Sequence, residues 1–169
     1  MPGLSDFFVM STRFKITAAL ASLAVITIAL RCLWLWQPER QLLLHQAHLR
    51  SAVERRDWAR VEALVDAGYS DRWGYTRATA IRDARQWIGQ FFVLTVTASS
   101  ARDQLSADGG TVTERWTIDG TGTEAAGLVK ERVNGLQAPF VFQWKHGNWK
   151  PWDWSLSRVD NPELELSGM

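Results

Sequence analysis

The chain has 169 residues, of which 46% are hydrophobic and 22% charged, with a formal net charge of +1. This length allows one ordinary domain plus an appendage, and the composition is that of a folded chain rather than a disordered one. The near-neutral charge excludes the basic excess of a general nucleic-acid binder, and the single cysteine, Cys32, excludes an intramolecular disulfide and a cysteine-based zinc site.

The first element predicted along the chain is a membrane-spanning helix over residues 16–36, preceded by a tail over 1–15. These 21 residues contain one charged side chain, Arg31. At about 1.5 Å per residue, a helix of this length spans roughly the hydrocarbon core of a bilayer. Trp34 and Trp36 come near its end, where an aromatic belt is expected at the membrane interface.

Two alternatives to an anchor exist for this segment, a buried core helix and a cleaved signal peptide. A core helix rarely runs this long without polar residues. Cleavage requires small residues just after the apolar run, but residues 31–36 read RCLWLW, and Arg31 also stands where a lipoprotein signal has a small residue. We therefore expect an uncleaved signal anchor. The short N-terminal tail favours a cytoplasmic N-terminus and an extracytoplasmic (periplasmic) domain, although arginines after the run, such as Arg40 and Arg50, favour the reverse orientation.

Three helices are predicted next. The first covers residues 39–56, where Leu42, Leu49 and Val53 recur at helical spacing. The other two cover 58–67 after Asp57 and 77–90 after Thr76, because Asp and Thr are favoured N-cap residues.

Alternating side chains then predict strands, at 92–105, 111–119, 126–145 with an interruption at Asn134-Gly135, and 149–156. Helices followed by hairpin-linked strands indicate an α+β fold with an antiparallel sheet. The domain is assigned to residues 38–158, and residues 159–169 are expected to form a flexible tail.

Three segments carry a resemblance to a known superfamily. Residues 57–65 read DWARVEALV, residues 76–91 form the capped third helix, and residues 142–150 read FQWKHGNWK. Over residues 39–158 the chain resembles the NTF2-like (SnoaL-like, cystatin-like) superfamily. The resemblance implies a curved sheet wrapped around a long helix, forming a cone whose open end can hold a ligand.

The superfamily includes isomerases, dehydratases, cyclases and members without catalysis, so the resemblance does not settle function. No position matches the catalytic residues of the isomerase-like members well enough to carry their roles over. The N-terminal anchor departs from the typical soluble enzyme and looks more like the anchored members that act as envelope assembly subunits.

Glu114 is the candidate catalytic residue, because alternation places it with Val112, Trp116 and Ile118 on the expected concave face. A carboxylate in apolar surroundings has a raised pKa and can act as a general acid or base. The structural alternative is that Glu114 is solvated near the strand end or pairs with an arginine such as Arg132.

A second group of candidates is aromatic and could line the mouth of the cone. Its members, equally suited to packing between helices and sheet, are Tyr69, Trp73, Tyr75, Trp87 and Trp116. His45 and His48 lack the further ligands that a metal site needs, so no metal and no cofactor is predicted. Basic residues near 50–60 alternate with acidic ones, which argues against nucleic-acid binding.

The sequence thus favours a membrane-anchored, non-catalytic module that binds a partner protein, a second copy of itself or a small apolar ligand, besides the lipid bilayer at 16–36. One alternative is an anchored isomerase- or cyclase-like enzyme that uses Glu114. Another is a subunit of an envelope secretion or transport assembly.

Overall fold

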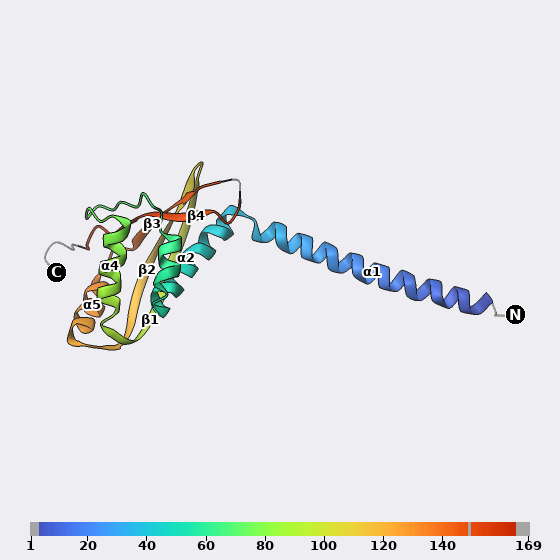
Figure 1. The fold of residues 1–169 in the computed structure, drawn as a ribbon, viewed down its shortest axis with the longest axis horizontal. Coiled ribbons are helices and arrows are strands. Elements are labelled where there is room, and N and C mark those ends of the chain that lie inside the picture. The colour runs from blue at the N-terminus through green and yellow to red at the C-terminus, as the bar shows by residue number, and fades with distance from the viewer. Residues whose placement is uncertain (1–3, 149, 165–169) are drawn as a thin grey trace. The chain divides into compact units, whose positions relative to one another are not determined.

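A computed structural model describes residues 4–148 and 150–164. The chain divides into two units, residues 1–37 and residues 38–169 (Figure 1). The first unit holds one helix, α1 (Leu4–Leu35), whose stretch Phe14–Leu35 is long and apolar enough to cross a membrane and is not buried in the protein. The apolar helix predicted at 16–36 is therefore present, and it is consistent with either a signal sequence or a single membrane anchor.

The second unit is an α+β domain with a four-stranded antiparallel sheet in the order β1-β2-β3-β4. Its elements are α2 (Pro38–Arg55), α3 (Trp58–Leu64), α4 (Arg77–Ile88), β1 (Phe91–Ser106), β2 (Gly109–Gly122), α5 (Glu124–Gly135), β3 (Phe140–His146) and β4 (Trp154–Asp160). Helix α2 contacts strands β1, β2 and β4, and α3 contacts β4. The predicted α+β fold, with three helices packed on a curved antiparallel sheet, is confirmed.

The helices begin where the sequence predicted. The Asp57 side chain accepts a hydrogen bond from the Arg60 amide at the start of α3. Thr76 and Thr79 form a reciprocal capping box at the start of α4, which satisfies two amides that would otherwise lack a partner. On α2, Leu42, Gln46 and Leu49 are buried at spacings of four and three residues, the pattern of one helix face.

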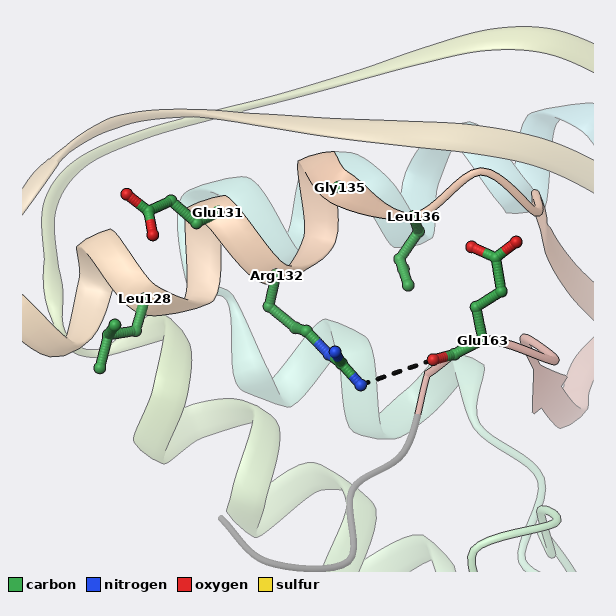
Figure 2. A pocket seen from close by; sticks show the side chains of 6 residues that line it. All are labelled: Leu128, Glu131, Arg132, Gly135, Leu136 and Glu163. Atoms are coloured by element: carbon green, nitrogen blue, oxygen red, sulfur yellow. Dashed lines mark hydrogen bonds between the residues drawn. The ribbon is translucent and has the colours of Figure 1, made fainter.

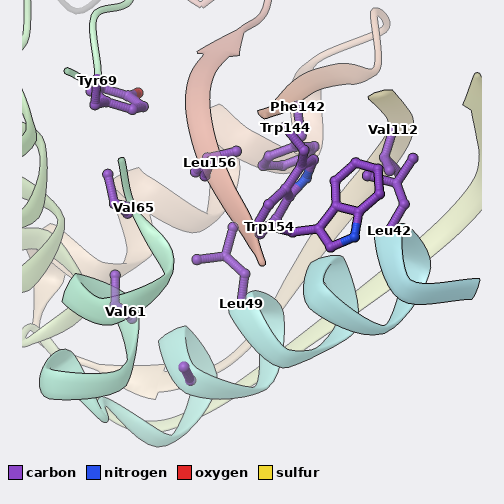
Figure 3. Close-up of a cluster of buried hydrophobic side chains, with 11 residues drawn as sticks. Leu42, Leu49, Val61, Val65, Tyr69, Val112, Phe142, Trp144, Trp154 and Leu156 are labelled. Atoms are coloured by element: carbon purple, nitrogen blue, oxygen red, sulfur yellow. The ribbon is translucent and has the colours of Figure 1, made fainter. Parts of the chain in front are cut away.

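The helices and the sheet enclose two clusters of buried apolar side chains. The larger one, drawn in Figure 3, joins α2, α3 and strands β2, β3 and β4, and its buried members include Leu42, Val112, Trp144 and Leu156. The smaller cluster comprises Ile88, Phe91, Leu94, Val96, Ile118 and Ala126. Partly buried Trp116 packs against both, so it joins the two halves of the core.

Strand β1 bends at two irregularities in its pairing with β2, one between Phe91 and Val93 and one between Ser99 and Arg102. Near the first, Gly120 of β2 has φ 151° and lies so close to the Val93 carbonyl that a Cβ at this position would overlap its oxygen. Only glycine allows this close approach of the two backbones.

One prediction was wrong in this region. Residues 126–145 do not form a third strand, because Glu124–Gly135 is helix α5 and the strand is confined to Phe140–His146. Thr123 caps α5 by accepting a hydrogen bond from the Ala126 amide. Ala126, Val129 and Val133 then pack against the smaller cluster at helical spacing.

The last strand also differs from the prediction of 149–156. Strand β4 starts at Trp154, and residues 147–148 and 150–153 belong to a loop rather than to a short hairpin turn. Strand β4 continues to Asp160, so the first residues of the predicted tail 159–169 belong to the sheet. Asn161 is buried and its side chain donates to the Ala138 carbonyl and accepts from the amides of Glu163 and Leu164. Residues 165–169 of that tail, and Trp149, lie outside the described residues.

Candidate functional site

Strand β2 places Glu114 inside the domain. Val112, Glu114 and Ile118 are buried on the face of the sheet that meets the helices, as alternation along the strand predicted. The Glu114 residue is only 2% exposed, so its carboxylate does not lie in solvent near the strand end.

The Glu114 carboxylate is the centre of a buried polar network. Its Oε1 accepts hydrogen bonds from Gln46 Nε2 at 2.5 Å and from Trp116 Nε1 at 2.5 Å. Gln46 also accepts a hydrogen bond at Oε1 from Trp144 Nε1 at 2.9 Å. The two oppositely directed hydrogen bonds fix the orientation of the Gln46 amide, and this connects strands β2 and β3 through helix α2.

The charge of Glu114 is balanced by Arg50, one helical turn after Gln46. Arg50 Nη1 lies 3.4 Å from Glu114 Oε2, and the arginine side chain remains 27% exposed while the glutamate is buried. The ion pair therefore runs from the interior of the domain to its surface. The suggested partner Arg132 does not fill this role, since its Nη2 donates to the Glu163 carbonyl at 3.5 Å.

Aromatic rings surround the network. Trp116 stacks on Phe142, with ring centroids 5.1 Å apart, and Phe140 lies 6.1 Å from both rings. Hydrogen bonds and an opposite charge offset the cost of burying a carboxylate in such an environment. The arrangement can anchor α2 to the sheet, and because Glu114 is buried it can present its carboxylate only to a molecule that enters the domain.

Three of the five aromatic candidates share the larger core cluster: Tyr69 is a member, and Tyr75 and Trp116 pack against it. Trp116 also belongs to the Glu114 network. Trp73 is half-buried and its Nε1 donates to the Leu164 carbonyl at 2.7 Å. Trp87 is half-buried on α4 and is not a member of either cluster.

Three of these aromatic residues lie in a loop organised by Asp71. The Asp71 Oδ1 accepts hydrogen bonds from the Trp73 and Tyr75 amides at 3.0 and 2.9 Å, and Oδ2 accepts from the Tyr69 hydroxyl at 3.1 Å. Burial, followed by the neighbouring Asp71 charge, raises the pKa of Tyr69, which therefore stays a neutral donor at physiological pH. The loop is thus held by its own side chains.

A surface depression of about 450 Å³ lies elsewhere, between α5 and the segment after β4 (Figure 2). It is lined by Leu128, Glu131, Arg132, Gly135, Leu136 and Glu163. None of these residues belongs to the Glu114 network or to the aromatic candidates. Within residues 4–148 and 150–164, no group of three or more His, Cys, Asp or Glu side chains is arranged to hold a metal.

Sequence reasoning missed three members of the network, namely Gln46, Arg50 and Trp144. A signal for Gln46 was present, since it lies between Leu42 and Leu49 on the same helix face as an isolated polar residue. A buried amide needs a hydrogen-bonding partner, so this position pointed to a second polar group opposite. The pairing with Glu114, 68 residues further on, could not be read from the sequence.

Comparison with known proteins places the domain in a fold class. No protein-family model and no curated protein matches the sequence, but solved structures share its fold. An NTF2-like protein of unknown function in nutrient uptake from Rhodospirillum rubrum is 21% identical with a TM-score of 0.51, over 70% of this chain and 93% of its own. An NTF2-like protein from Cytophaga hutchinsonii is 17% identical with a TM-score of 0.50, over 69% and 90%.

A third such structure is an NTF2-like protein of unknown function from Pseudomonas putida, 8% identical with a TM-score of 0.53, over 72% of this chain and 82% of its own. The domain therefore has the NTF2-like, cystatin-like fold, as the resemblance of residues 39–158 implied. At these identities the likeness concerns the fold alone.

Proposed function

We propose that this chain is a membrane-anchored NTF2-like domain that acts as a non-catalytic interaction module, binding a partner protein or a second copy of itself. The observation that carries the proposal is the state of the Glu114 carboxylate. It is buried and already bound by Gln46, Trp116 and Arg50. A general acid or base must come within hydrogen-bonding distance of its substrate, and here the carboxylate is buried and three protein groups already bind it.

The anchor has its own support. Near its end the apolar stretch Phe14–Leu35 contains Arg31, whose guanidinium lies 5.1 Å from the Trp34 ring centroid. Arginine and tryptophan near the end of a span are typical of the membrane interface. The absence of small residues at 31–36 argues against removal of this helix by a signal peptidase.

The anchor can be tested by fractionation of cells that express the full-length chain. We expect the protein to sediment with membranes, to resist alkaline extraction, and to show the intact mass of 19.1 kDa. A phosphatase that is active only outside the cytoplasm, fused after Met169, should be active, since we place the domain on the periplasmic side. A soluble product lacking residues 1–36 would refute the anchor, and an inactive fusion would refute the orientation.

A catalytic role of Glu114 is the second candidate, favoured by the position of a buried carboxylate beside the indole N–H of Trp116 on the concave face. Such an enzyme would be of the isomerase or cyclase kind. It requires a small ligand that enters the domain and contacts Glu114 directly.

The variant Glu114→Gln separates the two candidates. Glutamine keeps the shape of the glutamate side chain and one of its acceptor oxygens. The interaction proposal therefore predicts that the crosslinked species formed in membranes are the same for this variant and the wild type. The enzyme candidate instead predicts a ligand that raises the melting temperature of the wild type by several degrees and no longer does so for Glu114→Gln. If such a ligand is found, or if no defined larger species forms on crosslinking, the proposed function is refuted. If the crosslinked species contains other proteins, the chain is a subunit of an envelope assembly. If it contains only copies of this chain, the chain associates with itself.

A further inference from the structure

One end of the domain brings together the start of α2, the turn between β1 and β2, and residues 150–153 of the loop before β4. A Cβ placed on Gly110 would touch Leu42, which connects the β1–β2 turn to the second turn of α2. The His146 amide donates to the Asp108 carbonyl at 3.0 Å, which connects the same turn to the end of β3. These three segments are called the α2-start end below.

Trp152 is exposed at this end of the domain, with 55% of its surface accessible. The loop around it is held by hydrogen bonds from the Gly147 amide to the Asp153 carbonyl at 2.9 Å and from Trp154 Nε1 to the Pro151 carbonyl at 2.8 Å. Because these bonds fix the loop backbone, the large apolar ring of Trp152 is presented to the surroundings instead of folding onto the core.

Other exposed groups at the α2-start end are apolar or of both charges. Leu43 and Leu44 on the second turn of α2 are each partly exposed. The exposed charged residues are Glu39, Arg40, Asp108, Lys145 and Lys150, three basic and two acidic. This balance does not favour a strongly charged partner, so the contact that the surface can make depends mainly on its indole and leucine side chains.

The chain itself determines what lies within reach of this surface. Helix α1 ends at Leu35 and α2 begins at Pro38. Three Cα–Cα steps span at most about 11 Å. If α1 lies in the bilayer, as the proposed function holds, the start of α2 must lie within this distance of the membrane interface.

We propose that residues 150–153 and the first two turns of α2 form a surface that contacts the lipid bilayer, with the Trp152 indole in the headgroup region. Indole rings prefer this layer because one edge is polar and the rest apolar. The contact adds a second attachment point to the anchor, and the two together restrict the rotation of the domain on the membrane. This inference rests on the anchor in the proposed function.

The test uses the full-length chain, with Cys32→Ser removing its single cysteine. Trp152→Cys is introduced, labelled with an environment-sensitive fluorophore, and reconstituted in phosphatidylcholine vesicles that contain a lipid with a shallow quencher. We expect at least threefold stronger quenching at position 152 than at the matched control Leu128→Cys. Leu128 is also apolar and exposed (64%), and it lies on α5, which follows the opposite end of β2.

Two further labels make each outcome decisive. Lys150→Cys places the label in the same loop without removing the Trp152 indole. The quenching at position 150 should be as strong as at position 152. The natural Cys32, labelled in the wild-type chain, reports on the anchor. If position 32 is quenched while 150 and 152 are quenched no more than 128, the surface proposal is refuted and the anchor stands. If position 32 is not quenched, the anchor and this inference both fail.

Discussion

Replacing Glu114 with alanine is expected to lower the melting temperature of the full-length protein in detergent by roughly 10–20 °C, which corresponds to about 3–5 kcal/mol for loss of one partner of a buried ion pair. The reason is that the substitution leaves Gln46, Arg50 and the Trp116 indole N–H with no acceptor inside the domain. The measurement is thermal unfolding followed by tryptophan fluorescence.

A double-mutant cycle shows whether this loss comes from the ion pair. Arg50→Met combined with Glu114→Ala should destabilise less than the sum of the two single changes, since each single change leaves the other charge unpaired. The matched control is Arg82→Met, which removes the exposed contact with Asp83 at 2.8 Å and should change the free energy of unfolding by less than about 1 kcal/mol. Strict additivity, or a melting temperature of Glu114→Ala equal to that of the wild type, would show that the network does not hold the domain together.

The second large effect is expected at Gly120. Gly120→Ala should destabilise the domain by roughly 3 kcal/mol or more, because the added methyl group would overlap the Val93 carbonyl and the backbone has φ 151°, which L-residues rarely adopt. Urea unfolding of the full-length protein in detergent micelles measures the change. Strands β1 and β2 would have to separate locally to accept the substitution.

The same chain contains a control for a glycine-to-alanine change. Gly127 lies within α5 and a Cβ there would meet nothing within 4 Å. Gly127→Ala should therefore stabilise the domain by about 0.5–1 kcal/mol, the usual gain from replacing glycine inside a helix. If both variants are destabilised equally, the close approach of β1 and β2 at Gly120 is not the cause.

The positions of Glu114 and Trp116 were predictable because a strand with one buried face has a strict two-residue period. The helix caps at Asp57 and Thr76 were predictable because they depend on residues three positions away. Gln46 was overlooked because the role of one polar residue on an apolar helix face can be recognised only when its hydrogen-bonding partner is known. That partner, Glu114, lies on a strand distant in sequence, and a single sequence does not show which distant residues are in contact.

Helix α5 was missed for a different reason. Its valines favour a strand locally, but Thr123, Glu124 and the spacing of Ala126, Val129 and Val133 all indicate a helix. Tertiary packing against the smaller cluster selects the helix. The late start of β4 has a similar origin, because Pro151 cannot donate to a ladder and the loop is closed instead by Asp153.

The composition of the two clusters has a consequence for the order in which a nascent chain can fold. The buried members of the smaller cluster lie between Ile88 and Ala126, so most of this cluster can form as soon as the segment has emerged from the ribosome. The larger one needs Leu42 and Leu49 from α2 together with Trp154 and Leu156 from β4. Until those last residues are synthesised, part of the apolar face of α2 stays uncovered, and a chaperone or the lipid surface would have to shield it.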